Sequence, residues 1–430
     1  MSEQTEAACL LQSGAMYGSR ALLRRPAAEP VFAGFKHAAF SLYFGDAPIF
    51  HFDLEGRWQR AFVEGRHYLK GLDTTVQAID RAREGANLVL KRRTLGPAES
   101  SRLDARARAA ALGLLDGRLE PTDPPPSAKA RPLSAADLRA FLERIAAWDE
   151  SAWSAHRARY EAAYPDPLPF LPPDAQNAVV LQATAGPAGG APFGLGPVPP
   201  RPAGILGPEE FADHARAVAA LLGRRAEASR ALFLAGSDFL RQSAEWIAST
   251  LETAGQVFAL AADQGQGPRP GGIDTFLDDL NGLDPGPAAW SRFRSLRLRR
   301  VSLGVESGEE SVRALYAKTW KNEALRAVVA DMKGAGLGVN VLVLADAGGA
   351  EHAGRHRAAT ADLIATLGLG AGDLVALLDG EEVRDPARAP TGFTPLTAAA
   401  RAESQTWLRA AIRSGGGPKV APYSLEKQGG

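Results

Sequence analysis

Two carboxylates and a lysine are the residues of this chain whose types and surroundings best suit small-molecule chemistry. Glu306 directly follows an apolar run that ends at Val305, and Asp238 lies just after another apolar run and Gly236. A carboxylate at a strand end can accept hydrogen bonds from ribose hydroxyls or from an ammonium group, and a glycine lets the backbone approach a ligand. Lys318 adds a nearby cation. Each also has a simpler interpretation, with the carboxylates as helix caps and Lys318 as a surface lysine.

These residues need elements that hold them, and the stretch 298–349 predicts such elements. The run Leu298–Gly304 is rich in β-branched and large apolar residues, which favours a strand. Apolar residues then recur at helical spacing over 309–317 and 321–334, and glycines follow the second helix. The apolar run Val339–Leu344 predicts the next strand. This order predicts a βαβ unit of a parallel sheet.

The same stretch resembles a known family. The Ser-Leu-Gly-Val-Glu-Ser-Gly run at 302–308, Lys318 and the turn after the second helix are similar to the fourth and fifth strands of a radical S-adenosylmethionine (SAM) core, of the elongator and oxygen-independent coproporphyrinogen oxidase kind. The resemblance extends over roughly 164–423. It implies a SAM pocket formed by Gly236, Ser237, Asp238, Glu306, Ser307, Lys318, Gly348 and Gly349.

The iron–sulfur motif of that family is missing. In the family, three cysteines spaced C-x3-C-x2-C follow the first barrel strand and hold a cluster that coordinates SAM. The matching positions here are Pro187, Ala191 and Gly194, and none has an atom that can bind iron. No His, Asp or Glu lies between Thr184 and Glu209 to replace them. We therefore expect no iron–sulfur cluster in this loop.

The second half of the chain predicts alternating strands and helices. Six strands with intervening helices indicate a partial (βα)6 barrel of radical SAM type, with an open doubly wound sheet as the alternative. Ligands gather at the carboxyl ends of the strands in either case. The predicted strands are 178–183, 231–235, 257–261, 298–304, 339–344 and 374–378, and the predicted helices are 208–223, 240–254, 271–281, 309–317, 321–334, 351–367 and 397–413.

The first half predicts a small α+β domain. Alternating apolar residues such as Phe50 and Phe52 indicate an antiparallel meander, followed by a helix over 73–84, a strand over 87–93 and a helix over 101–115. The expected division is a flexible arm at 1–30, the α+β domain at 31–119, a Pro-rich linker at 120–133, a connecting helix (from Ser134 to about Tyr160) and a Pro-rich wrap at 134–176, and the barrel at 177–430.

Composition limits the classes of function. Lys plus Arg and Asp plus Glu number 49 each, so the net charge of zero gives no reason to expect nucleic acid as a partner. Cys9 is the single cysteine, which excludes a disulfide framework. No apolar run reaches the roughly 18 residues that span a bilayer, and no secretion signal is visible, so we expect a cytoplasmic protein. His352 and His356 share a helix face, but no third ligand is evident, and no metal site is predicted.

Three functions fit these observations. The first is a degenerate radical SAM-like protein without cluster ligands, which acts as a non-catalytic binding or accessory protein and keeps a pocket for SAM or another small molecule. The second is an enzyme that uses SAM in cluster-free transfer chemistry. The third is a subunit whose cluster comes from a partner. The expected partners are another protein or an intact radical SAM paralogue, and the sequence identifies no catalytic residue, substrate or pathway.

Overall fold

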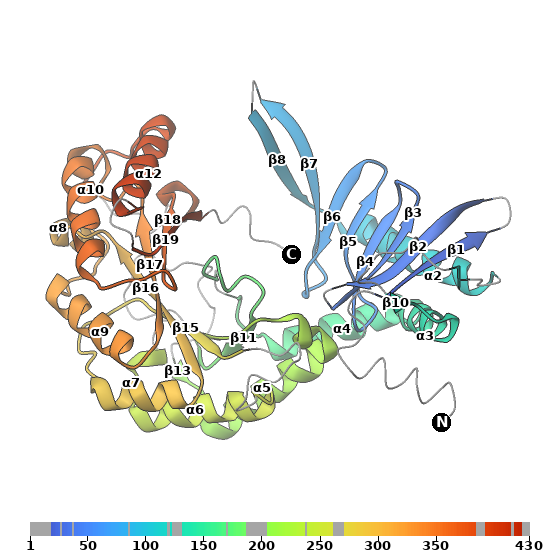
Figure 1. Cartoon of the computed structure of the whole chain (residues 1–430), viewed down its shortest axis with the longest axis horizontal. Coiled ribbons are helices and arrows are strands. Elements are labelled where there is room, and N and C mark those ends of the chain that lie inside the picture. The colour runs from blue at the N-terminus through green and yellow to red at the C-terminus, as the bar shows by residue number, and fades with distance from the viewer. Residues whose placement is uncertain are drawn as a thin grey trace.

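The computed structural model describes residues 19–25, 28–36, 38–84, 87–117, 121–122, 131–168, 171–185, 204–236, 239–260, 271–383, 392–413 and 417–423. These residues form a ten-stranded, mainly antiparallel sheet in the N-terminal half and a parallel seven-stranded sheet in the C-terminal half, each with helices packed on it (Figure 1). The fold is therefore α/β with an additional α+β part, as predicted. Within the described residues, no helix is both long and apolar enough to cross a membrane.

The N-terminal sheet is a meander in which most neighbours along the chain pair with each other, and α2 and α3 contribute to its core. Phe35 and Phe40 contact Phe141 of α3 at ring-centroid distances of 4.8 and 4.6 Å. The elements are β1 (Ser19–Arg25), β2 (Ala28–Lys36), β3 (Ala39–Phe44), β4 (Ile49–Asp53), β5 (Trp58–Val63), β6 (Arg66–Lys70), β7 (Val76–Glu84), β8 (Asn87–Thr94), α2 (Pro97–Leu115), β9 (Pro121–Thr122), β10 (Arg131–Pro132) and α3 (Ala135–Ala146).

Two predicted helices in the first half are wrong in detail. The segment predicted as a helix over 73–84 is strand β7, in which Val76 and Ala78 are buried and Gln77 is half-buried, so its true period is two. The helix predicted from Ser134 to Tyr160 is interrupted, because Asp149 caps a separate helix, α4 (Glu150–Ala163). Strand β1 lies inside the predicted arm, and β9 and β10 lie inside the predicted linker and pair with β1.

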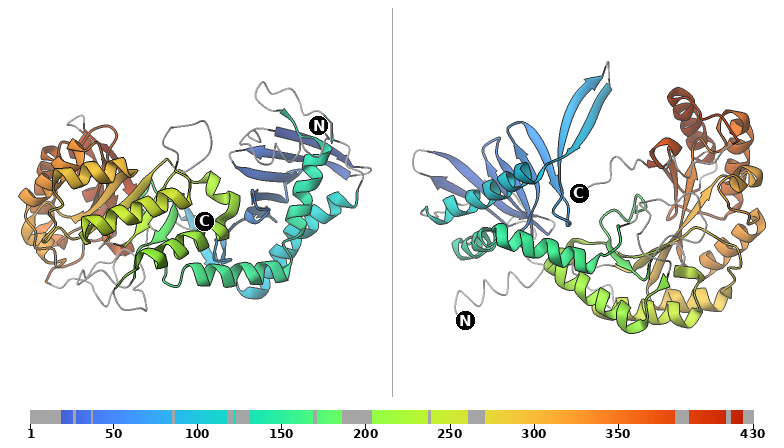
Figure 2. Two further views of the ribbon diagram at one scale, coloured as in Figure 1. Left: turned by 90° about the horizontal axis from the view of Figure 1, so that it is seen from below. Right: turned by 180° about the vertical axis from the view of Figure 1, so that it is seen from behind.

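The parallel sheet has the strand order β11-β14-β15-β16-β17-β18-β19, which is the order of the chain. A doubly wound sheet would reverse direction at a switch point, so this order identifies the partial-barrel alternative. Figures 1 and 2 show its helices along the outer side of the curved sheet. The strands are β11 (Val179–Gln182), β14 (Leu232–Ala235), β15 (Ile273–Leu277), β16 (Leu298–Glu306), β17 (Gly338–Leu344), β18 (Leu374–Leu378) and β19 (Lys419–Tyr423), with β12 (Thr184–Ala185) and β13 (Gly204–Ile205) forming a separate pair.

The third strand of the barrel is not where the sequence placed it. The segment predicted as the strand 257–261 begins at the end of α6, whereas β15 lies within the predicted helix 271–281. Thr275 of β15 donates a hydrogen bond to the carbonyl of Leu234 in the neighbouring strand. The helical elements of this half are α5 (Pro208–Leu222), η2 (Gly223–Ala228), η3 (Phe239–Arg241), α6 (Ala244–Val257), α7 (Gly286–Ser295), α8 (Glu310–Ala314), α9 (Asn322–Gly334), α10 (Gly349–Thr366), α11 (Gly380–Val383) and α12 (Ala398–Arg413).

The two halves are joined by a buried arginine. Arg57 forms an ion pair with Asp53 at 2.7 Å and donates hydrogen bonds to the carbonyls of Leu221 and Leu222 at 2.7 and 2.6 Å. Those carbonyls belong to the last turn of α5, where helix carbonyls lack partners within the helix. The Glu55 carboxylate also accepts a hydrogen bond from the backbone N–H of Arg224. The N-terminal sheet therefore completes the end of a barrel helix.

Candidate functional site

The carboxyl ends of β15 and β16 bring two carboxylates and an ammonium into contact. The Lys318 Nζ atom lies 2.6 Å from Asp278 Oδ1, 2.6 Å from Glu306 Oε2 and 2.9 Å from the carbonyl oxygen of Gly304. The exposed fractions of Asp278, Glu306 and Lys318 are 6%, 7% and 2%. An ammonium has three N–H donors, so these contacts satisfy Lys318 completely. The prediction that Lys318 could be a surface lysine is wrong.

The backbone of β16 directs Glu306 toward this group. The pairing of β16 with β17 shifts register between Gly304 and Glu306, and Glu306 has a φ of 56°. A bulge of this kind re-aims the side chains that follow it, and a left-handed φ is uncommon for a residue with a Cβ atom. Glu309, rather than Glu306, is the cap of α8. The backbone therefore places Glu306 beside Lys318 instead of at the helix end.

Gly304 is required by the closeness of these side chains. A Cβ atom at this position would lie 2.3 Å from Asp278 Oδ1 and 2.9 Å from Lys318 Nζ. Both distances are shorter than real Cβ contacts, and the side chains in the way are already fixed by hydrogen bonds. The glycine in the Ser-Leu-Gly-Val-Glu-Ser-Gly run thus leaves space for Asp278, Glu306 and Lys318, which we call the ion-pair group.

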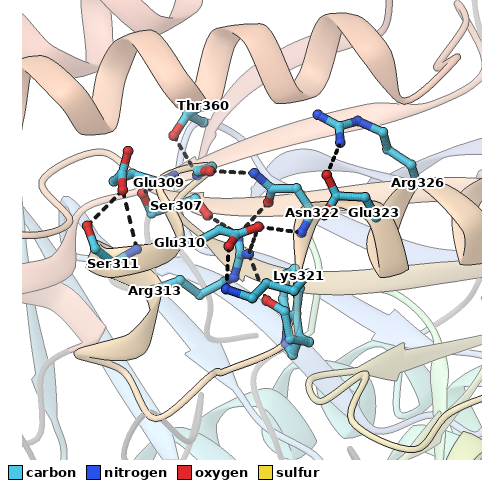
Figure 3. Close-up of polar contacts among 12 residues, drawn as sticks. Ser307, Glu309, Glu310, Ser311, Arg313, Lys321, Asn322, Glu323, Arg326 and Thr360 are labelled. Carbon is cyan, nitrogen blue, oxygen red and sulfur yellow. Dashed lines mark hydrogen bonds and ion pairs between the residues drawn. The ribbon is translucent and has the colours of Figure 1, made fainter.

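A second network supports the turn that follows Glu306 (Figure 3). Arg313, whose side chain is fully buried, donates to the carbonyls of Ser307 and Trp320 and to Asn322 Oδ1, at 2.8 to 2.9 Å. Its guanidinium also lies 3.8 Å from the centre of the Trp320 ring. Asn322 in turn donates to the carbonyl of Gly308. These contacts tie the turn to the start of α9, and three of them satisfy backbone carbonyls, those of Ser307, Gly308 and Trp320.

The ionisation of the group follows from its burial. Burial raises the pKa of Glu306 to about 7; Lys318 opposes this rise, Asp278 reinforces it, and the more distant charge of Arg313 opposes it weakly. Burial alone would lower the pKa of Lys318, but Asp278 and Glu306 outweigh it and hold that pKa above its usual value. Lys318 is therefore charged at neutral pH, and the Glu306 proton is exchangeable there.

The group carries surplus negative charge when both carboxylates are ionised. Two carboxylates face one ammonium, while Arg313 is paired with Glu310 at 4.0 Å on the other side of the turn. Among the described residues, no hydrogen bond reaches Asp278 Oδ2 or Glu306 Oε1. A buried site with surplus negative charge and free acceptor oxygens is suited to a cationic ligand with N–H or O–H donors.

Ser307, Gly348 and Gly349 have structural partners. The Ser307 hydroxyl is hydrogen bonded to His356 Nδ1 at 2.8 Å, which directs it toward α10. A Cβ atom on Gly348 would meet Val312, and one on Gly349 would lie 2.2 Å from the carbonyl oxygen of Thr394. Both glycines have positive φ angles. Their role in a ligand pocket remains a prediction, whereas their role in packing is visible.

The part of the predicted pocket near β14 is only partly described. Gly236 has a φ of 112°, and a Cβ atom there would lie 1.8 Å from the hydroxyl oxygen of Thr184, so Thr184 occupies the space that Gly236 leaves. The other positions predicted in this part of the chain, Ser237, Asp238, Pro187, Ala191 and Gly194, lie outside the described residues.

The structure separates the two histidines considered for a metal. His356 is buried, and burial lowers its pKa to about 4. His352 is half-buried, and its Nδ1 atom lies 2.7 Å from the Arg355 guanidinium. Within the described part of the chain, no group of three or more His, Cys, Asp or Glu side chains could hold a metal ion.

Sequence reasoning missed Asp278 and Arg313. Asp278 directly follows β15, which had been predicted as a helix, so its place at a strand end could not be recognised. The β-branched residues Ile273 and Thr275 were the available signal. Arg313 lies in the predicted helix 309–317, and only the tertiary structure shows that its side chain is buried.

The chain was compared with protein families, curated proteins and solved structures. No family model matches, and no curated protein matches. Solved structures that match include HydG, a maturase of the [FeFe]-hydrogenase, with 13% identity over 74% of this chain and 65% of that chain and a TM-score of 0.37. The archaeal Methanocaldococcus infernus Elp3 matches with 11% identity over 57% of this chain and 56% of that chain, with a TM-score of 0.36.

A third match is the cobalamin-dependent S-adenosylmethionine radical enzyme OxsB, with 13% identity over 44% of this chain and 26% of that chain and a TM-score of 0.33. In each of these matches the chain spans less than two thirds of the length of the neighbour. TM-scores of this size leave the family of the chain open.

Proposed function

We propose that this chain binds a cationic nucleoside-type ligand, with SAM as the reference compound, at the ends of β15 and β16. It would act as a binding or accessory protein rather than as a radical enzyme. One observation carries this proposal: Asp278 and Glu306 share the single ammonium of Lys318, each with a second oxygen that has no hydrogen-bond partner among the described residues. A cationic ligand would offset the surplus charge that burial makes costly.

The acceptor oxygens of the site suit the charged groups and donors of SAM. Its sulfonium and ammonium groups are positive, and its ribose hydroxyls are donors for carboxylate oxygens. Glu306 and Asp278 would hold these groups, and Lys318 would keep the two carboxylates in place. When bound, SAM supplies an activated methyl group on its sulfonium. The proposal requires only that the chain's own residues bind and orient the ligand.

The cluster that accompanies SAM in the radical family does not fit this chain. Pro187, Ala191 and Gly194 offer no donor atom, and Cys9 is the single cysteine of the sequence. These residues therefore do not support a radical step on a cluster held in this loop. An accessory role implies a protein partner, such as an intact radical SAM paralogue, which affinity capture from the native host followed by mass spectrometry would identify.

The test is a calorimetric titration with SAM and S-adenosylhomocysteine. We expect SAM to bind in the micromolar range, about −8 kcal/mol. S-adenosylhomocysteine lacks the sulfonium charge and should bind about tenfold more weakly. Glu306→Gln should weaken the binding of SAM more than the binding of S-adenosylhomocysteine, which has no sulfonium charge. Glu309→Gln is the matched control, because Glu309 lies on the same turn but caps α8. No heat with SAM at millimolar concentration would overturn the proposal.

Cluster-free transfer chemistry is the second candidate, and the pKa of Glu306 favours it. A carboxylate with a pKa of about 7 is suited to accept a proton at neutral pH. Incubation of the protein with labelled SAM and a cell extract, with Glu306→Gln as the control, would show transfer of label to an acceptor. Tight SAM binding without any transfer of label would contradict the enzymatic candidate and favour the binding protein.

A further inference from the structure

A second cavity lies in the N-terminal half, far along the chain from the ion-pair group. It has a volume of about 560 Å³ and lies between α2 and α4. This volume is in the range of small-molecule sites. We call it the α2–α4 groove and define it by six of its lining residues: Asp104, Arg108, Trp148, Trp153, Ser154 and Arg157.

A fixed carboxylate, that of Asp104, lines the groove. Asp104 Oδ1 accepts hydrogen bonds from both Trp58 Nε1 and Lys70 Nζ. Lys70 also lies over the Trp153 ring, 3.7 Å from its centre. Among the described residues, no hydrogen bond reaches Asp104 Oδ2, and the Asp104 side chain is 17% exposed. The carboxylate is thus held rigidly by one oxygen and offers the other to a donor.

Two arginines offer cationic donors along the same groove. The Nε atom of Arg108 donates to the carbonyl of Ala146, and the Nε atom of Arg157 donates to the hydroxyl of Thr74. These contacts orient both guanidinium groups and leave their terminal nitrogens without a partner among the described residues. A guanidinium with free terminal N–H groups binds a carboxylate in a bidentate manner.

The rest of the lining is aromatic and apolar. Trp148 and Trp153 pack against each other with ring centroids 4.8 Å apart, and Ala105, Ala109 and Leu112 of α2 also line the cavity. Asp149, another acidic residue that lines the groove, accepts a hydrogen bond that caps α4. The groove therefore combines an acceptor for an ammonium, donors for a carboxylate and a surface for an apolar group.

We propose that the α2–α4 groove binds a free α-amino acid with an aromatic or large apolar side chain. The ligand's ammonium would donate to Asp104 Oδ2, its carboxylate would accept from Arg108 and Arg157, and its side chain would pack on the tryptophans. Contact between an aromatic side chain and the two tryptophan rings adds to the free energy gained from burial alone. This site is independent of the ligand proposed for the barrel.

The experiment compares three probes by calorimetry on the full chain. L-phenylalanine has both charged groups, 3-phenylpropionate lacks the ammonium, and phenethylamine lacks the carboxylate. We expect L-phenylalanine to bind with a Kd below about 1 mM and each of the other two at least about tenfold more weakly. Equal binding of all three, or no heat with L-phenylalanine at about 10 mM, would overturn the proposal.

Variants locate the binding. Arg157→Gln should weaken L-phenylalanine binding about tenfold, whereas Arg159→Gln, on the same helix but not lining the groove, should leave it unchanged. Both arginines are exposed, so neither change should prevent folding. Equal affinities in the two variants would contradict the assignment. Glu306→Gln should bind L-phenylalanine like the unaltered protein, which keeps this test separate from that of the barrel site.

Discussion

Glu306 binds its proton more tightly in the folded chain than in the unfolded chain. Its pKa rises from 4.5 to about 7, chiefly by burial. Between these values the folded state holds more protons, so this group makes the protein less stable as pH rises through the window. The penalty is absent below about pH 4.5 and complete above about pH 7. A residue suited to binding cations is thus a cost to stability at neutral pH.

Glu306→Gln removes this titration. We expect the variant to lose less stability than the unaltered protein between pH 5 and pH 8, with a difference on the order of 1–3 kcal/mol. Urea unfolding at the two pH values measures it. Buried His156 and His356, whose pKa values are both lowered to about 4, titrate in the opposite sense in both proteins and cancel in the difference. A profile parallel to that of the unaltered protein would contradict the assignment.

Asp278→Asn tests how much the negative charge of Asp278 raises the pKa of Glu306. Removing that charge leaves Glu306 alone with Lys318, so the pKa of Glu306 should fall, because Asp278 is one of the causes of its rise. Nuclear magnetic resonance titration of the Glu306 carboxyl carbon would follow the change. An unchanged midpoint would show that burial alone sets the value. Asp279→Asn, on the adjacent residue, is the control, since Asp279 pairs with Arg241 instead.

At the level of elements, strand β16 and its glycine hold the group together. Gly304→Ala would place a methyl group against Asp278 and Lys318, which are already bonded to each other. We expect a loss of about 1–3 kcal/mol in the free energy of unfolding, together with weaker SAM binding. Gly334→Ala at the end of α9, where a Cβ atom meets nothing within 4 Å, should be neutral or slightly stabilising. Thermal unfolding of both variants provides the comparison.

Much of the barrel was predictable because its strands are continuous apolar runs. β16 and β17 carry the buried pattern of a parallel sheet, and the helices between them have a clear apolar face. β15 was not predictable in this way, since Asp274 and Thr275 break its apolar run. Both are buried and bonded, to Arg299 and to Leu234 respectively, and those partners belong to neighbouring strands. Local periodicity cannot reveal polar residues that tertiary contacts satisfy.

The sequence predicted some residues of the candidate site but not the contacts between them. Glu306 and Lys318 were both selected from the sequence, but their contact was not, because Lys318 follows a short helix whose direction the sequence does not determine. Asp278 and Arg313 were missed for the reasons of tertiary structure given above. Glu309, and not Glu306, caps the helix that follows.

For the whole molecule, Arg57 is a buried contact between the N-terminal sheet and the barrel. Arg57→Met would remove the donors of Leu221 and Leu222 and leave Asp53 buried without its partner. Breaking a buried pair from one side typically costs about 3–5 kcal/mol. We expect a lower midpoint of thermal unfolding and a transition that separates into two. Arg60→Met, at an exposed neighbouring position, is the control, and equal midpoints for the two variants would contradict this role.

The pairing of β9 and β10 with β1 has a consequence for how the chain is made. The first strand of the N-terminal sheet pairs with β2 and also with two short strands within residues 121–132, whereas the first strand of the barrel begins at Val179. During synthesis the ribosome therefore releases every strand of the first sheet before the first strand of the barrel. Domains generally fold as units in the order in which they emerge. The N-terminal sheet would then already present Arg57 when the last turn of α5 leaves the exit tunnel.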